Sequence, residues 1–77
     1  MRISIEYCTQ WNYLPRAASM ASALLEKYGN AVGSLALIPS GGGVYEVVKN
    51  DNLIFSKKAE ERFPELDEII ESLEKPV

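Results

Sequence analysis

The chain has 77 residues, and its 47% apolar and 25% charged content is that of one folded domain, residues 1–77, rather than of a disordered segment. Eleven acidic against eight basic residues give a net charge of −3, and the largest basic cluster is Lys57–Lys58, which argues against nucleic acid or an anionic membrane as partner. One cysteine and no histidine exclude an intramolecular disulfide, a Ser-His-Asp or Cys-His pair and a conventional zinc site.

The first residues, Met1 to Glu6, alternate apolar and polar side chains and contain no continuous apolar run. We therefore expect neither a signal peptide nor a membrane span. A free thiol suits the reducing cytoplasm, and the cytoplasm is where we expect this protein.

Residues 2–7 alternate apolar and polar side chains, which predicts the first strand. Asn12 is placed to cap the next helix, and Pro15 is tolerated in a first helical turn. Gly29-Asn30 is expected to end this helix. Its predicted apolar stripe consists of Leu14, Ala17, Ala18, Ala21, Leu24, Leu25 and Tyr28.

The apolar runs that follow predict strands over residues 32–38, 44–49 and 52–56. Pro39 is expected to stop the first of these, and residues 40–43, Ser-Gly-Gly-Gly, form a flexible loop. Asn50-Asp51 can adopt positive φ, so it predicts a tight hairpin turn.

Residues 57–62 are a charged connector with room for a helical turn. Pro64 is expected to begin the last helix, with Pro76 just past its end and Phe63 packing as an anchor. The apolar stripe of this helix is Leu66, Ile69, Ile70 and Leu73, and its carboxylates form a solvated face.

The element order is therefore β-α-β-β-β-α, which predicts an α/β fold with a four-stranded mixed sheet and two helices. A parallel right-handed crossover joins the first two strands, and an antiparallel hairpin joins the last two. We expect strand order 2-1-3-4, with both helices on one face of the sheet.

Cys8 lies where the first strand ends and the first helix is about to begin. Unpaired N–H groups and the helix dipole stabilise a thiolate at such a place, where we expect it within reach of solvent and of a visiting thiol. Arg16 would add to this effect if it folds back, and Glu6 would oppose it. The alternative is that Cys8 is a buried small hydrophobe, as lone cytosolic cysteines usually are.

The glycine run 41–43 is not a phosphate-binding loop, since no Lys-Ser/Thr follows it. Its small residues would allow a partner's backbone to approach closely. Trp11 and Tyr13 flank the predicted helix start, where Trp11 is either a docking surface or packs against this loop.

The segment Tyr7-Cys8-Thr9-Gln10-Trp11-Asn12-Tyr13-Leu14-Pro15-Arg16-Ala17-Ala18 resembles the redox loop of the selenoprotein W, T and H (Rdx) family, above all of its short bacterial members. Those read Tyr-Cys-Thr-Gln-Cys-Asn-Trp-Leu-Leu-Arg-Ala-Ala. Further matches, in order over nearly the whole chain, are Met20-Ala21, Leu24-Leu25, Leu37-Ile38-Pro39, Gly42-Gly43-Val44-Tyr45-Glu46-Val47, Ser56-Lys57-Lys58 and Arg62-Phe63-Pro64-Glu65.

The resemblance implies a thioredoxin-like fold and a redox loop of the form Cys-X-X-Cys or Cys-X-X-selenocysteine. Cys8 matches the first redox position and Trp11 the second. We therefore expect a thiol-based redox protein that forms a mixed disulfide through Cys8 with glutathione or a protein thiol and needs no cofactor. Thr9, Gln10, Gly42 and Gly43 are the expected substrate contacts.

Trp11 cannot form a disulfide, so a dithiol cycle lacks its resolving thiol within the chain. Three explanations stay open. The protein can work with one thiol, using glutathione or a partner as resolver, or it can be a redox-inactive interaction module that uses the Trp11 and Gly-loop surface. Alternatively, the natural residue is selenocysteine, whose codon UGA differs from the tryptophan codon UGG in one base.

Overall fold

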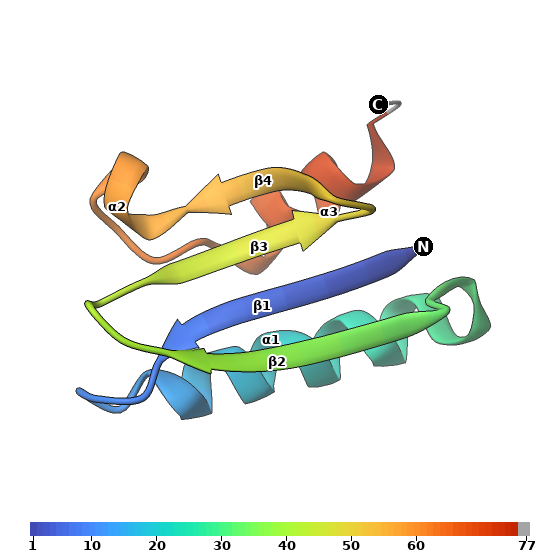
Figure 1. The fold of residues 1–77 in the computed structure, drawn as a ribbon. Coiled ribbons are helices and arrows are strands. Elements are labelled where there is room, and N and C mark those ends of the chain that lie inside the picture. The colour runs from blue at the N-terminus through green and yellow to red at the C-terminus, as the bar shows by residue number, and fades with distance from the viewer. Residues whose placement is uncertain (76–77) are drawn as a thin grey trace.

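The sheet has four strands in the order β2-β1-β3-β4, as the sequence predicts, in a computed structural model that describes residues 1–75. Strand β1 pairs in parallel with β2 and antiparallel with β3, and β3 pairs antiparallel with β4 (Figure 1). The elements are β1 (Arg2–Cys8), α1 (Tyr13–Tyr28), a 3-10 turn (Gly29–Ala31), β2 (Ser34–Ser40), β3 (Tyr45–Lys49), β4 (Asn52–Ser56), α2 (Lys57–Glu60) and α3 (Leu66–Glu74).

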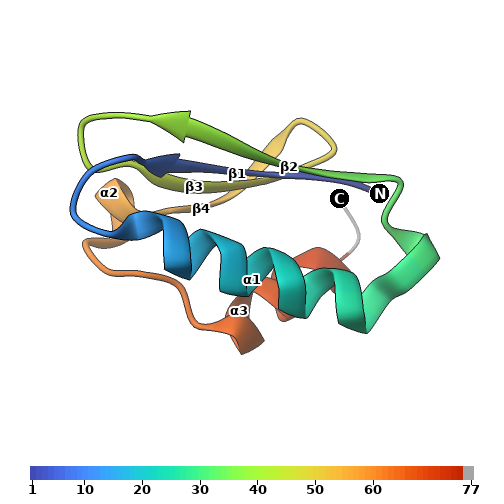
Figure 2. The ribbon, with the colours of Figure 1, turned by 90° about the horizontal axis from the view of Figure 1, so that it is seen from below.

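Helices α1 and α3 lie against one face of the sheet, and no helix of the described chain covers the other face (Figure 2). The core forms between the two layers. Ile5 of β1, Val47 of β3, Leu24 of α1 and Ile69 of α3 are all fully buried there. The thioredoxin-like α/β fold is confirmed, with α2 as a third, short helix where the sequence predicted a connector.

Strand β2 starts two residues later than expected and runs through Pro39 instead of stopping before it. β2 is an edge strand, so only one of its sides is hydrogen bonded. The amide of Thr9 donates to the carbonyl of Ser40 at 2.9 Å, so Ser40 faces the sheet. The neighbouring Pro39 therefore directs its missing N–H to the outer edge, where proline is tolerated.

The buried stripe of α1 differs from the predicted one. Leu14 and Leu25 are 49% and 45% exposed, whereas the residues facing the sheet follow an i, i+4, i+7, i+8, i+11 pattern. These buried residues are Tyr13, Ala17, Met20, Ala21 and Leu24. The true stripe begins at Tyr13, which the prediction omitted together with Met20.

Helix α3 begins at Leu66 rather than at Pro64. Glu65 occupies the N-cap position, and its side chain and that of Glu68 form a reciprocal capping box. Pro76 lies outside the described residues. The tight hairpin between β3 and β4 is confirmed, because Asn50 and Asp51 have φ of 49° and 71°.

Candidate thiol site

Cys8 is the last residue of β1, and the loop Thr9–Asn12 connects it to α1. Trp11 and Asn12 both adopt left-handed backbone conformations, with φ of 56° and 63°. These two residues turn the chain into the helix. Asn12 does stand at the N-cap position, but its side chain makes no capping hydrogen bond, so the expected side-chain cap is wrong. The left-handed backbone differs from the extended conformation that a capping side chain needs.

The sulfur of Cys8 is fully buried, so its expected exposure is wrong. Its Sγ accepts a hydrogen bond from the backbone N–H of Gln10 at 3.4 Å, and the Cys8 amide donates to the carbonyl of Val44 at 2.8 Å. The N–H group at the sulfur thus belongs to the loop, not to the first turn of α1. Cys8 belongs to the buried hydrophobic core, as the alternative of a buried small hydrophobe predicts. The Thr9 N–H donates to the Ser40 carbonyl at 2.9 Å and holds the first residue of the loop against the edge strand.

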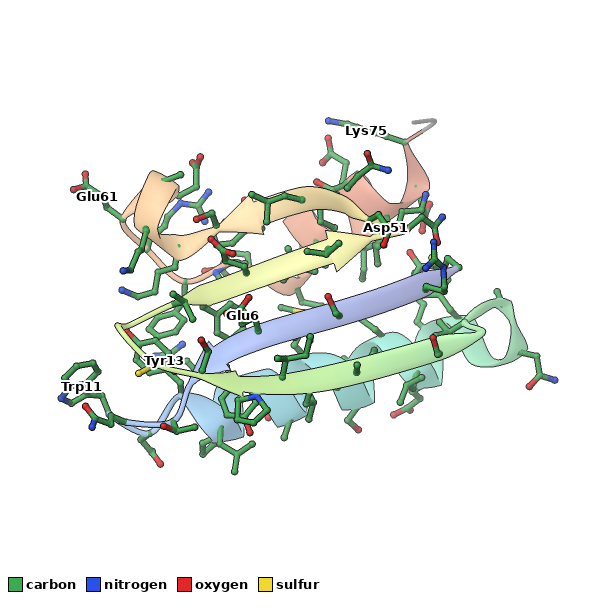
Figure 3. The ribbon with its side chains drawn as sticks, in the orientation of Figure 1. Glu6, Trp11, Tyr13, Asp51, Glu61 and Lys75 are labelled. Atoms are coloured by element: carbon green, nitrogen blue, oxygen red, sulfur yellow. The ribbon has the colours of Figure 1, made fainter. Side chains whose placement is uncertain are left out.

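The three residues after Cys8 are exposed, and among the large apolar residues of the described chain Trp11 is the most exposed, at 70%. Its ring lies 6.5 Å from that of Tyr13, centroid to centroid, at an angle of 53°. Figure 3 shows Trp11 projecting beyond the end of the sheet. The two family redox positions therefore differ sharply: residue 8 is enclosed and residue 11 faces solvent.

The glycine loop, residues 41–43, lies beside the loop Thr9–Asn12 that follows the thiol. Gly42 and Gly43 have φ of 71° and 76°, which other residues rarely adopt. A Cβ atom on Gly43 would lie 3.8 Å from the Tyr13 hydroxyl and 3.9 Å from Cζ3 of Trp11. Trp11 therefore lies beside the glycine loop and still exposes most of its surface. Of the expected substrate contacts, Thr9, Gln10, Gly42 and Gly43 all lie in these two adjoining loops.

An aromatic cluster next to these loops was not foreseen, apart from the packing role of Phe63. The Phe63 ring meets Tyr13 edge to face at 4.9 Å and Tyr45 at 5.5 Å. Arg16 does not fold back toward the thiol as considered above. Its guanidinium carbon lies 4.1 Å above the centre of the Phe63 ring. The sequence did contain a hint of this cluster, because the aromatic Tyr45 stands two residues after Gly43, close to the glycine loop.

Burial raises the pKa of Tyr45 to about 12, although the nearby Arg16 charge opposes the shift. The phenol is therefore neutral at physiological pH and donates to the backbone carbonyl of Arg16 at 3.4 Å. This bond ties β3 to the first turns of α1. Tyr45 thereby supports the position of the helix that follows the thiol loop.

Within residues 1–75, no group of three His, Cys, Asp or Glu side chains is placed to hold a metal ion. None of the helices described is long and apolar enough to cross a membrane.

Fold and site together define a small thioredoxin-like domain with one thiol at the end of its first strand. The Rdx family model matches residues 2–75, so the chain belongs to the Rdx family. A selenoprotein W-related protein from Vibrio cholerae is 32% identical, with a TM-score of 0.90 over 94% of this chain and 90% of that one. A protein from Bordetella parapertussis is 38% identical, with a TM-score of 0.89 over 94% and 91% of the two chains. No curated protein sequence matches the chain.

Proposed function

We propose that this protein is a one-thiol redox protein that forms a mixed disulfide through Cys8 with glutathione or a protein thiol in the reducing cytoplasm. The observation that carries the proposal is the hydrogen bond from the Gln10 N–H to Sγ of Cys8 at 3.4 Å. The thiolate is the nucleophile in disulfide exchange, and this loop amide is a hydrogen-bond donor next to the sulfur that would react. Membership of the Rdx family supports the same role.

The exchange is balanced without a cofactor. The Cys8 thiolate attacks the glutathione sulfur of a glutathionylated protein thiol, a sulfur–sulfur bond forms between Cys8 and glutathione, and the protein thiolate leaves and takes up a proton. Because the chain has one cysteine, a second glutathione must then attack the glutathione sulfur of the adduct. That attack releases the Cys8 thiolate and forms oxidised glutathione, so the net reaction reduces the protein mixed disulfide with glutathione.

The buried sulfur requires the loop Thr9–Asn12 to open before this attack. The loop is exposed, and the bond from the Thr9 amide to the Ser40 carbonyl at 2.9 Å holds it to the edge strand. Opening such a short exposed loop costs far less than unfolding the domain. The closed form protects the thiol between encounters.

Mass spectrometry after incubation with oxidised glutathione tests the proposal. The native protein should gain one glutathionyl group, and the Cys8→Ser variant should gain none. The proposal fails if the native protein stays unmodified while the same protein in urea is modified. That result would identify Cys8 as a structural thiol.

A second candidate is a redox-inactive interaction module, which the contrast between the exposed Trp11 and the enclosed Cys8 favours. Its surface would be Trp11, Tyr13 and the glycine loop. This role predicts that Cys8→Ser leaves the binding of partner proteins intact, while disulfide reductase assays read zero. Loss of partner capture in Cys8→Ser would count against it.

The remaining proposal is that the natural protein contains selenium, as selenocysteine at position 11. If codon 11 of the source gene is UGA, the natural residue is selenocysteine and the site has a second redox atom. Sequencing that codon tests this directly, since UGG would establish tryptophan as the native residue.

A further inference from the structure

Strand β2 forms one edge of the sheet, and its outer backbone groups have no strand to pair with (Figure 1). The Ser40 carbonyl accepts the Thr9 amide and therefore faces β1, as do the backbone groups of every second residue before it. The amides and carbonyls of Leu35 and Leu37 consequently point outward along the edge. Unpaired groups of this kind are a template for another strand.

The two edges of the sheet differ in how they are protected against such pairing. Natural edge strands are protected by charged side chains, bulges or covering segments. At the other edge, the pairing of β4 with β3 contains a register shift, and Glu60, Arg62 and Glu68 help to line the groove along β4. Residues 31–45, which contain β2, have no charged side chain, and Pro39 is the one feature that limits pairing there.

Exposed apolar side chains lie at the β2 edge in both layers of the molecule. Leu37 and Ile38 of β2 are 37% and 43% exposed, and Leu14 and Leu25 of α1 are also large, apolar and exposed. The flank of α1 that includes Arg16 lines a groove together with β3 and the segment before α3. By helical periodicity, Leu14 and Leu25 lie on the opposite flank and therefore face the β2 edge.

We propose that two copies of this chain pair through their β2 strands, antiparallel about a two-fold axis, and form one continuous sheet. The inference goes beyond the proposed thiol chemistry and does not depend on it. With Ala36 opposite itself, Leu35 and Leu37 of each copy exchange hydrogen bonds with Leu37 and Leu35 of the other. All the outward groups of these two leucines are then paired, and the missing N–H of Pro39 lies outside the bonded segment.

A second copy fits this edge better than an isolated peptide strand because it brings its own helix layer. Helix α1 contacts β1 and β2, so its axis lies on the inner side of β2. With strands about 4.8 Å apart, the two antiparallel α1 helices lie about 10–14 Å apart and do not overlap. Leu14 of one copy then lies on the side of Leu25 of the other. Pairing about Ala36 also puts Glu6 in the same cross-strand row as Arg2 of the other copy, so like charges do not face each other.

Sedimentation equilibrium under reducing conditions tests the dimer without an intermolecular disulfide of Cys8. The mean mass should rise from 8.6 kDa toward twice that value as the protein concentration increases through the micromolar range. Ala36→Lys and Ala36→Glu each place like charges about 5 Å apart across the axis, which weakens the dimer about fourfold in water. An equimolar mixture of the two variants should associate about 15-fold more tightly than either variant alone.

A charge control and an exchange measurement locate the interface. Leu53→Lys puts a charge on an exposed residue of the other edge strand and should leave dimerisation unchanged. Circular dichroism should show the same fold for every variant. The amides of Leu35 and Leu37 should exchange more slowly at high protein concentration, whereas those of Ala36 and Ile38, which face β1, should not change.

Three results overturn the proposal. The first is a parent protein that stays monomeric throughout the concentration range, even if β2 binds a peptide of another protein. The second is a dimer that both charged variants at position 36 retain at the parent's affinity and whose mixture shows no gain. The third is a dimer in which exchange at Leu35 and Leu37 does not depend on concentration, since such a dimer uses another surface.

Discussion

Alkylation of Cys8 in the native protein should be about 30-fold slower than in the unfolded chain. The sulfur is fully buried as part of the hydrophobic core, and we expect the adjoining loop Thr9–Asn12 to be the segment that moves when a reagent reaches it. Two hydrogen bonds hold the loop there, from Thr9 N–H to the Ser40 carbonyl at 2.9 Å and from Gln10 N–H to Sγ at 3.4 Å. At a net value of about 1 kcal/mol each, their loss costs about 2 kcal/mol, which is a factor of about 30.

The assay uses iodoacetamide, which is uncharged, so nearby charged side chains hardly change its concentration at the site. Since the chain has one cysteine, mass spectrometry counts the product without ambiguity. Rates are measured at fixed pH in buffer, at low urea and in fully denaturing urea. If the alkylation rate does not change with urea at low concentration, a small local opening that exposes little surface limits the rate.

Two results would refute this reasoning. A native rate equal to the unfolded rate would mean that the sulfur is open to reagents and that the loop does not protect it. A native rate that rises with urea as steeply as global unfolding does would mean that the whole domain must open. The second result would also remove the basis for Cys8 as a redox centre.

Three further predictions concern the site and the helix after it. Trp11→Gly should be more stable than Trp11→Ala by about 1 kcal/mol, because φ is 56° at this position, and the urea midpoint by circular dichroism should differ by about 1 M. Equal midpoints would contradict the left-handed backbone. Trp11→Cys should form an intramolecular disulfide with Cys8 under oxidised glutathione, seen as the loss of two hydrogens in the mass, whereas a persistent glutathione adduct would show that residue 11 cannot resolve it. Hydrogen bonds from Arg62 and from the Glu65 amide lower the pKa of Glu68 to about 2. Their stabilisation is therefore complete above the ordinary pKa of 4.5 and is lost as the pH falls toward 2. Since the pair is solvated, we expect at most about 1 kcal/mol relative to Glu68→Gln, and a difference independent of pH would contradict this origin.

The sheet could be predicted because its strands carry local signals that tertiary packing reinforces. Apolar and polar side chains alternate over residues 2–7 with a period of two. In the parallel pair of β1 and β2, Ile3 lies opposite Leu35 and Ile5 lies opposite Leu37. The Asn50-Asp51 dipeptide fixes the hairpin by its backbone preference alone. The expected strand order is confirmed: β1 lies in the centre, between its parallel neighbour β2 and its antiparallel neighbour β3, although the crossover rule itself fixes only the handedness of the first unit.

The site could be predicted only in outline, because its decisive features are not local. The position of Cys8 at a strand end follows from pattern, but its burial depends on how the loop folds back. No dipeptide preference indicates a left-handed conformation for tryptophan, and such a conformation costs about 1–2 kcal/mol. The cation and aromatic cluster brings α1, α2 and the segment before α3 together, from residues 16, 57 and 63.

The left-handed backbone conformation of Trp11 affects the order in which a reaction partner would contact residue 11 and Cys8. Trp11 occupies a strained conformation yet buries little of its side chain, so packing does not account for the strain. The same turn points residue 11 outward and closes the loop over residue 8. Under the redox function proposed above, a partner would therefore contact residue 11 first and would reach the buried sulfur only after the loop has opened. Such a partner would favour the open loop only to the extent that it binds the open form more tightly than the closed form, so contacts made solely after opening would determine its selectivity.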